Sequence, residues 1–322
     1  MSTEIVKPDN ALPAPLVERM AEQARASRAE TTWAAYAADW RVWQAWANEH
    51  GASVLPASVE AVAAFLSDMS RTRKLSTLRR YLASISVAHQ AKGIAFETGA
   101  APIRAIMRGC ARQKVGDRRR VKPLMPRHAL ARIDAAVGGR LVDLRDAALL
   151  SLGIAMAGRR SEVAGLDWLA RGDGRGVLEL TEHGAVVKLY NSKTAQDRID
   201  EVAIQDGPAL ITVRTWVERA GILPGSALFR AVTPRGRVSP RRIADRTIAR
   251  IVKRAADAAG LDAAEFSGHS MRAGLITAAV ERGAPEWKVR LTSRHSARSR
   301  ELAEYIRPLE KRRHALTSEV EL

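Results

Sequence analysis

The chain of 322 residues has very little cysteine and no long apolar stretch. Its one cysteine, Cys110, excludes an internal disulfide and a zinc cluster built on cysteines, and is typical of a reducing compartment. No run approaches the ~18 apolar residues of a membrane helix. Residues 1–30 lack the apolar segment of a secretion signal. We therefore expect a cytoplasmic protein that neither spans a membrane nor is secreted.

Acidic residues are also few, since 35 Asp and Glu stand against 52 Lys and Arg and leave a formal net charge of +17. Hydrophobic residues make up 46% of the chain, which is enough to bury a core. A folded protein with this excess of positive charge is predicted to bind a polyanion, most often nucleic acid. The length favours two domains over one.

The first part of the chain is predicted to be a helical bundle. After a loose lead at residues 1–30, apolar residues recur at helical spacing up to residue 114. The predicted helices are residues 31–49, 58–69, 77–89 and 102–112. The first carries an aromatic stripe of Trp33, Tyr36, Trp40 and Trp43. Such a stripe could stack on bases, but its regular spacing favours packing against other helices.

Residues 115–123 are rich in Arg and end at Pro123, which indicates a linker between two domains, although a solvated loop has the same composition. Three short runs beyond it alternate or are β-branched and predict a small antiparallel sheet. These strands are residues 177–181, 185–190 and 199–204. Helices are predicted at residues 127–136, 141–157, 208–220, 240–259, 268–282 and 285–292. The fold class is thus mainly α with a small antiparallel β-sheet.

Several polar islands interrupt these elements. In chain order they contain Arg159 with Glu162, Lys193, His269 with Arg272, His295 and Tyr305. Taken alone, Arg159 and Glu162 are an ordinary helical ion pair, and Lys193 lies in a solvated turn. His269 and Arg272 share the first turn of a predicted helix, whose N-terminus favours anions, so this island predicts a phosphate site.

Taken together, the order Arg, Lys, His-x-x-Arg, His, Tyr resembles the tyrosine site-specific recombinases, or phage-type integrases. Residues 158–162 (Gly-Arg-Arg-Ser-Glu), 268–272 (Gly-His-Ser-Met-Arg) and 305–307 (Tyr-Ile-Arg) are similar to the signature boxes of that family. The resemblance covers the whole chain. It implies a helical core-binding domain at 31–114 and an α+β catalytic domain at 124–307, which form a C-shaped clamp around DNA.

The resemblance also implies a role for each residue of the islands. Arg159 and Arg272 would hold the scissile phosphate, Lys193 would lie on a flexible hairpin, His269 and His295 would flank the phosphate, Glu162 would support them, and Tyr305 would be the nucleophile. Two guanidinium groups can stabilise the charge of the reacting phosphate without a metal, so we expect no metal and no cofactor. Ten positions separate His295 from Tyr305, where the family usually has nine.

The expected partner is a double-stranded DNA recombination site, on which the protein would act as a homotetramer close to the nucleoid. Candidate DNA contacts are Arg79, Arg80, Arg104, Arg108, Arg118, Arg119, Arg120, Arg241 and Arg242. The tail at 308–322 is either a frayed terminus or, as in related recombinases, a segment that docks on a neighbouring protomer, here through Leu309 and Leu316. Two alternatives stay open: DNA relaxation like that of type IB topoisomerases, and sequence-specific DNA binding without catalysis. The sequence does not separate integration from excision or resolution.

Overall fold

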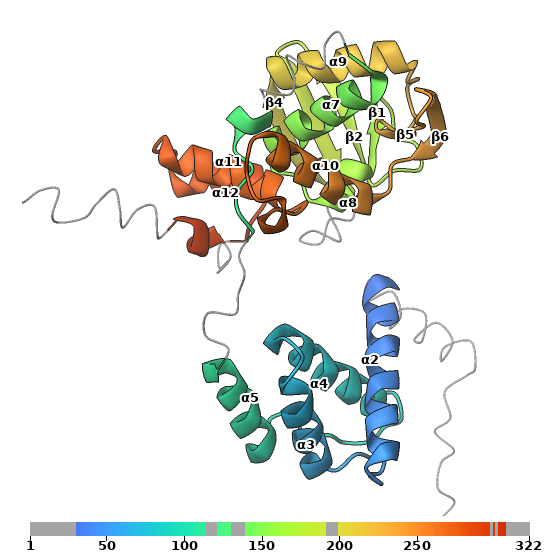
Figure 1. Cartoon of the computed structure of the whole chain (residues 1–322), viewed down its shortest axis with the longest axis vertical. Helices are drawn as coiled ribbons and strands as arrows, with labels where there is room; N and C mark the ends of the chain where they lie inside the picture. Colours follow the sequence, from blue (N-terminus) through green and yellow to red (C-terminus); the bar gives the residue numbers. More distant parts are fainter. Residues whose placement is uncertain are drawn as a thin grey trace, which may run out of the picture. The chain divides into compact units, whose positions relative to one another are not determined.

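The computed structural model describes residues 30–113, 121–129, 139–190, 199–296, 299 and 302–306 (Figure 1). The predictions for the lead, for linker residues 115–120, for Lys193 and for the tail at 308–322 lie outside these residues. The chain divides into two compact units, Met1–Arg119 and Arg120–Leu322. No helix in the described part is long and apolar enough to cross a membrane.

In the described residues 30–113 of the first unit, four helices lie within two residues of their predicted bounds. They are α2 (Glu30–Glu49), α3 (Val59–Ser70), α4 (Leu75–Gln90) and α5 (Ala101–Gln113). Ser58 is the N-cap of α3, where its side chain accepts a hydrogen bond from the backbone N–H of Ala61 at 3.1 Å. Each helix packs against at least two of the others.

Aromatic side chains form the centre of this bundle. Trp43 is fully buried, and its ring lies 5.2 Å from that of Phe65 and 5.9 Å from that of Trp46. The predicted aromatic core is therefore confirmed for the second half of α2. Trp33 and Tyr36, in the first half, are only partly buried and lie outside this core. Their rings contact each other edge to face instead, with the ring centres 6.2 Å apart.

The second unit contains a four-stranded sheet in the order β1-β2-β3-β4. Its strands are β1 (Leu166–Trp168), β2 (Gly176–Thr181), β3 (Gly184–Leu189) and β4 (Asp200–Gln205). The three predicted strands are confirmed, and β2, β3 and β4 pair antiparallel as expected. The prediction missed β1, which pairs parallel to β2, because three residues are too few to show alternation.

The second unit also contains helices, some of which lie next to this sheet (Figure 1). They are α7 (Leu141–Ala155), α8 (Arg160–Ala164), α9 (Pro208–Ala220), α10 (Asp245–Ala258), α11 (Ser270–Glu281) and α12 (Glu286–Ser293), with a short 3₁₀ turn at Ala263–Glu265. Eleven consecutive residues of α7 are buried, since it packs against α9, α10 and α11. The mainly helical fold with a small sheet is therefore confirmed.

Two local predictions in this unit were wrong. The helix expected from residue 240 begins at Asp245, because residues 240–242 belong to β6 (Val238–Arg242), which pairs with β5 (Arg230–Val232). A proline such as Pro240 fits an edge strand as well as a helix start. Tyr190 was the last residue of the strand predicted at 185–190, but it follows the end of β3 and is partly exposed, with the Arg171 guanidinium 4.4 Å from its ring centre.

Candidate active site

The candidate active site is built on the turn of residues 156–159 that follows α7. Ala157 has a left-handed backbone (φ 46°), which turns the chain sharply between α7 and α8. The carbonyl groups of this turn accept hydrogen bonds from two arginines that are distant in sequence. Arg272 Nη1 donates to the Ala157 carbonyl at 3.0 Å, and Arg294 Nη1 donates to the Met156 carbonyl at 3.0 Å.

Arg159 and Glu162 form an ion pair at the start of α8, as their spacing predicts. Arg159 Nη1 lies 2.5 Å from Glu162 Oε1, and the Arg159 backbone N–H donates to Glu162 Oε2 at 2.8 Å. The Glu162 side chain is buried, whereas about a fifth of the Arg159 side chain (21%) is open to solvent. The carboxylate thus holds a guanidinium group that a ligand can reach.

Glu162 has a second cationic partner, Arg294, whose Nη2 lies 2.6 Å from Glu162 Oε2. Burial by itself raises the pKa of the Glu162 carboxyl group. The charge of Arg294, the backbone N–H of Arg159 and the charge of Arg159 outweigh burial, so that the pKa is lowered from its ordinary 4.5. Glu162 is therefore ionised at neutral pH, between two guanidinium groups.

Arg272 and His295 form the second half of the site. Arg272 lies on α11 and is 1% exposed, and His295 follows α12. The Arg272 Nη2 atom lies 3.3 Å from Nδ1 and 3.2 Å from Nε2 of the His295 ring. The ring is held from the other side by the Ser293 hydroxyl, 2.8 Å from Nδ1.

His269 is the N-cap residue of α11, one turn before Arg272, and it is partly exposed. The preceding Gly268 packs directly on the side chain of Arg160 in α8. A Cβ atom at position 268 would approach the Arg160 Cγ and Cδ atoms to 2.0 Å. A larger residue at 268 would force the exposed Arg160 side chain to move, so glycine lets the segment at 268–272 lie against the segment at 158–162 with Arg160 in its present position.

Tyr305 lies on a short helix at residues 302–306. Leu302 and Ile306 are buried in a cluster with residues of α11 and α12, and the partly buried Tyr305 packs against the same cluster. The tyrosine is thus carried on the two helices that position Arg272 and His295. Of the predicted site residues, the structure joins Arg159 to Glu162 and Arg272 to His295 by direct contacts.

Sequence reasoning missed Arg294, which links these two halves. The sequence does not indicate a role for Arg294, because one arginine is not distinctive in a chain with 52 Lys and Arg. Lys193 falls in residues 191–198, which the structure does not describe. Among the described residues, no three His, Cys, Asp or Glu side chains gather as metal ligands would.

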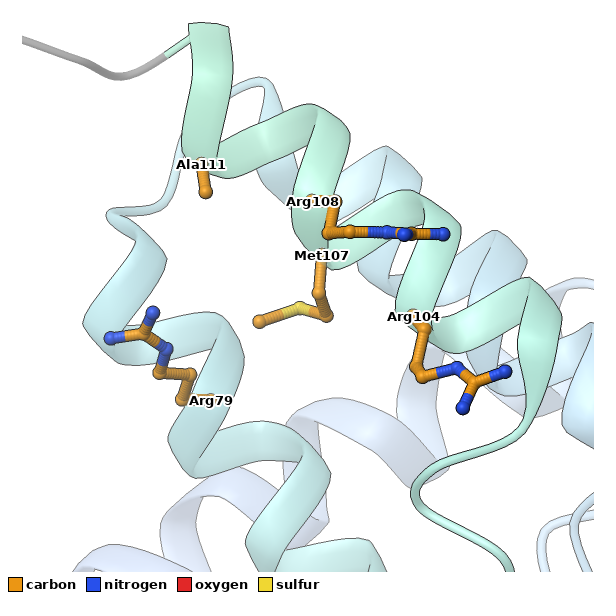
Figure 2. A pocket seen from close by; sticks show the side chains of 5 residues that line it. All are labelled: Arg79, Arg104, Met107, Arg108 and Ala111. Atoms are coloured by element: carbon orange, nitrogen blue, oxygen red, sulfur yellow. The ribbon is translucent and has the colours of Figure 1, made fainter.

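The candidate DNA contacts divide into exposed and ion-paired arginines. Arg79 of α4 and Arg104 and Arg108 of α5 are exposed and line a hollow of about 580 Å³. Figure 2 shows the Met107 and Ala111 side chains projecting from α5 into the space between the helices. The Arg79 side chain extends from α4 at the edge of this space.

Two other candidates are engaged within the protein. Arg80 binds both carboxylate oxygens of Asp39, at 2.5 and 2.9 Å. Arg242 pairs with the fully buried Asp167 at 2.6 Å and also with Asp173. Arg241 is exposed, and residues 118–120 lie outside the described part. We therefore keep Arg79, Arg104, Arg108 and Arg241 as candidates for contact with phosphate groups.

Comparison with known proteins supports one family. Residues 113–312 match the phage integrase family. The chain is 30% identical over 280 residues to an integrase/recombinase XerD homologue of Selenomonas ruminantium, a match that covers 84% of this chain and 80% of the relative.

Solved structures have the same fold. The Tn1549 transposon integrase in complex with circular intermediate DNA has a TM-score of 0.55 at 12% identity, covering 95% of this chain and 99% of that one. The XerH recombinase in a post-cleavage complex with its difH substrate has a TM-score of 0.53 at 15% identity. This match covers 80% of this chain and 69% of the XerH chain. The chain belongs to the phage integrase family and is a tyrosine recombinase, an enzyme that breaks and rejoins DNA in site-specific recombination.

Proposed function

We propose that Tyr305 cuts one DNA strand at a phosphate held by Arg159 and Arg272. The observation that carries this proposal is the placement of the two arginines. Arg159 lies in the turn of residues 156–159, and Arg272 donates to the Ala157 carbonyl of the same turn at 3.0 Å. Two guanidinium groups fixed at one turn suit a phosphate, whose charge is concentrated on two non-bridging oxygens.

The reaction exchanges one phosphoester bond for another. The Tyr305 phenol has an ordinary pKa near 10 and must lose its proton as it attacks, and His269 is the proposed acceptor. The bond between phosphorus and the 5′ oxygen breaks. The leaving 5′ oxygen takes a proton, for which Lys193 is the proposed donor. The products are a 3′-phosphotyrosyl bond and a free 5′-hydroxyl. Rejoining reverses these steps without an external energy source.

The test is a search for the covalent product. The recombination site is first mapped by sequencing junctions formed in cells that carry the native flanking DNA. A nicked duplex of that site is then incubated with the full chain, and the proposal predicts an adduct that survives SDS. Tyr305→Phe should abolish the adduct, while Tyr190→Phe, which changes a partly exposed tyrosine outside the cluster, should not. An adduct formed by Tyr305→Phe would refute the assignment of the nucleophile.

We further propose that the first unit grips DNA through the exposed arginines of α4 and α5. A second hollow of about 300 Å³ shares Arg79 with the first and is lined also by Ser86 and Gln90 of α4. Arginine contacts phosphates and guanine edges, and glutamine can pair with adenine. This surface therefore combines positive charge with groups that can distinguish bases.

Assembly as a tetramer is proposed through the tail. Helix α12 exposes two apolar side chains four residues apart, Trp287 (63%) and Leu291 (67%). The chain continues for 16 residues beyond Ile306 and contains Leu309 and Leu316. We propose that this segment covers the exposed pair of a neighbouring copy. Deleting residues 309–322 should weaken assembly on paired sites and leave binding to a single site intact, and unchanged assembly would exclude this role.

The biological outcome is tested with supercoiled plasmids. A plasmid with two mapped sites should yield recombinant junctions, as a recombinase requires. Relaxation of the plasmid without strand exchange would favour an activity like that of type IB topoisomerases. We also propose that the protein is cytoplasmic and associated with the nucleoid, because its substrate is DNA.

A further inference from the structure

We propose that Arg294 is a positioning residue, which holds Glu162 and thereby orients Arg159 toward the scissile phosphate. This inference rests on the proposed role of Arg159. Arg294 does not need to touch the DNA, because it acts through the carboxylate that it shares with Arg159.

The backbone at Arg294 is unusual for an arginine. Arg294 caps α12 with φ 54° and ψ 37°, a left-handed conformation that glycine adopts without cost and that other residues seldom adopt. Its side chain is nevertheless 4% exposed. At position 294 the unfavourable backbone conformation is therefore offset by the contacts of the buried side chain.

Those contacts connect α12 to the turn of residues 156–159. Arg294 Nη2 lies 2.6 Å from Glu162 Oε2, across 132 positions of sequence. Its Nη1 donates to the carbonyls of Met156 at 3.0 Å and Thr292 at 3.2 Å. Glu162 is therefore shared by two arginines: Oε1 accepts from the Arg159 guanidinium, and Oε2 accepts from the Arg159 backbone N–H and from Arg294.

The charges explain why this sharing matters for a phosphate. Arg159 with Glu162 alone forms a neutral pair, and the carboxylate would oppose the field of the guanidinium at the reacting oxygens. Arg294 adds a second positive charge, so the group of three carries a net charge of +1. It also restrains Glu162 through Oε2, while Oε1 binds the Arg159 guanidinium, and this restraint fixes the direction of that guanidinium.

Arg294 also links the two halves of the site. The residue that follows it is His295, which lies 3.2 Å from Arg272 Nη2. Arg272 and Arg294 donate to neighbouring carbonyls, those of Ala157 and Met156. Arg294 and Arg272 use different carbonyls, so a change at Arg294 removes the contacts with Glu162 and Met156 without removing an atom that Arg272 binds.

The test compares two variants on two substrates. Arg294→Gly removes the guanidinium and suits the left-handed backbone, and Arg294→Lys keeps the charge but loses the fork that binds both Glu162 and Met156. Single-turnover formation of the covalent adduct is measured on the mapped nicked duplex. The second substrate carries a methylphosphonate at the scissile position, which replaces one charged non-bridging oxygen by a methyl group. Thermal melting and DNA anisotropy report folding and binding.

We expect Arg294→Gly to slow cleavage of the phosphate substrate by about 10- to 100-fold, the usual effect of removing a residue that orients a site group. Arg294→Lys should fall between Arg294→Gly and the wild type. On the methylphosphonate substrate, Arg294→Gly should slow cleavage by only about threefold or less. The negatively charged oxygen that Arg159 would stabilise is replaced by a methyl group in this substrate. The control Arg290→Gln changes an arginine of the same helix that pairs with Glu286 at the surface, and it should leave both rates unchanged.

A double-mutant cycle decides between positioning and general destabilisation. If Arg294 acts through Arg159, the variant Arg159→Ala with Arg294→Gly should be no slower than Arg159→Ala alone. Additive losses, or equal losses on the two substrates, would overturn the inference. If Arg159→Ala itself cleaves normally, the proposed function fails. If Arg159→Ala is inactive while both Arg294 variants match the wild type, only this inference fails. Should Arg294→Gly not fold, Arg294→Lys carries the same comparison.

Discussion

Arg79 and Arg80 are neighbours on α4 that the structure predicts to have different roles in DNA binding. Arg79 is exposed and lines the hollow beside Arg104 and Arg108. Arg80 binds both oxygens of Asp39, whose side chain is 4% exposed. Replacing each by alanine removes one positive charge from the same helix turn, so each variant serves as the control for the other.

The expected magnitudes follow from these surroundings. Loss of one phosphate contact should reduce the slope of log affinity against log salt by about 0.9. Between 50 and 200 mM salt, the loss of affinity should then be about 3.5-fold smaller for Arg79→Ala than for the wild type. Arg80→Ala should leave the slope of log affinity against log salt unchanged, but it removes the partner of the buried Asp39 carboxylate. Because the Arg80 side chain is half exposed (48%), we expect a loss of about 1 to 2 kcal/mol in the free energy of unfolding.

Both quantities can be measured on the full chain. Fluorescence anisotropy with a labelled duplex gives the affinity at several salt concentrations, and urea denaturation gives the free energy of unfolding. An unchanged slope for Arg79→Ala would refute its contact with phosphate. An Arg80→Ala variant that lowers the slope as much as Arg79→Ala, without loss of stability, would show that the ion pair with Asp39 does not decide the role of an arginine on this helix.

Three further predictions concern stability. The pKa of Glu162 is lowered in the folded protein, so its contribution to stability is present above the unfolded pKa near 4.5 and is lost as the pH falls through the folded pKa. Glu162→Gln should therefore lower the free energy of unfolding by about 3 kcal/mol at pH 7, with a smaller difference below pH 4.5 in acid titrations of urea unfolding; a difference independent of pH would contradict this. Gly274→Ala should unfold the second unit or lower its melting temperature strongly, since a Cβ there would lie 1.9 Å from the backbone carbonyl oxygen of Leu124, and a wild-type melting curve would refute the contact. His89 accepts a hydrogen bond from the Ala57 backbone N–H at 2.9 Å in a fully buried position, so His89→Leu should cost about 1 to 3 kcal/mol in urea unfolding, and hydrogen exchange should show a faster Ala57 amide.

Periodicity was a reliable guide to the elements of this chain. The helices of the first unit and the strands β2, β3 and β4 lie within about two residues of their predicted bounds. The errors occur where the pattern is short or ambiguous. The strand β1 has three residues, and Pro240 is compatible with both a strand and a helix start. These choices depend on which neighbouring segment is available for pairing.

The aromatic stripe of α2 shows the same limit. The sequence predicts one continuous apolar face, and Trp43 and Trp46 are indeed buried. Whether Trp33 and Tyr36 are covered depends on how far the partner helices reach, which no pattern within α2 can report. The sorting of arginines into exposed and paired is equally invisible, since Arg79 and Arg80 differ only in the position of Asp39.

The sequence by itself determined the family, and it supplied the residues that we propose for the chemistry, because phosphate transfer needs particular side chains and their order along the chain is specific. Only the tertiary structure decided how these side chains are supported. Glu162 and Arg294 are 132 positions apart, and their contact exists because α8 and the end of α12 pack on the same turn. Local spacing encodes neighbours within an element, whereas contacts between elements arise from packing of the whole core.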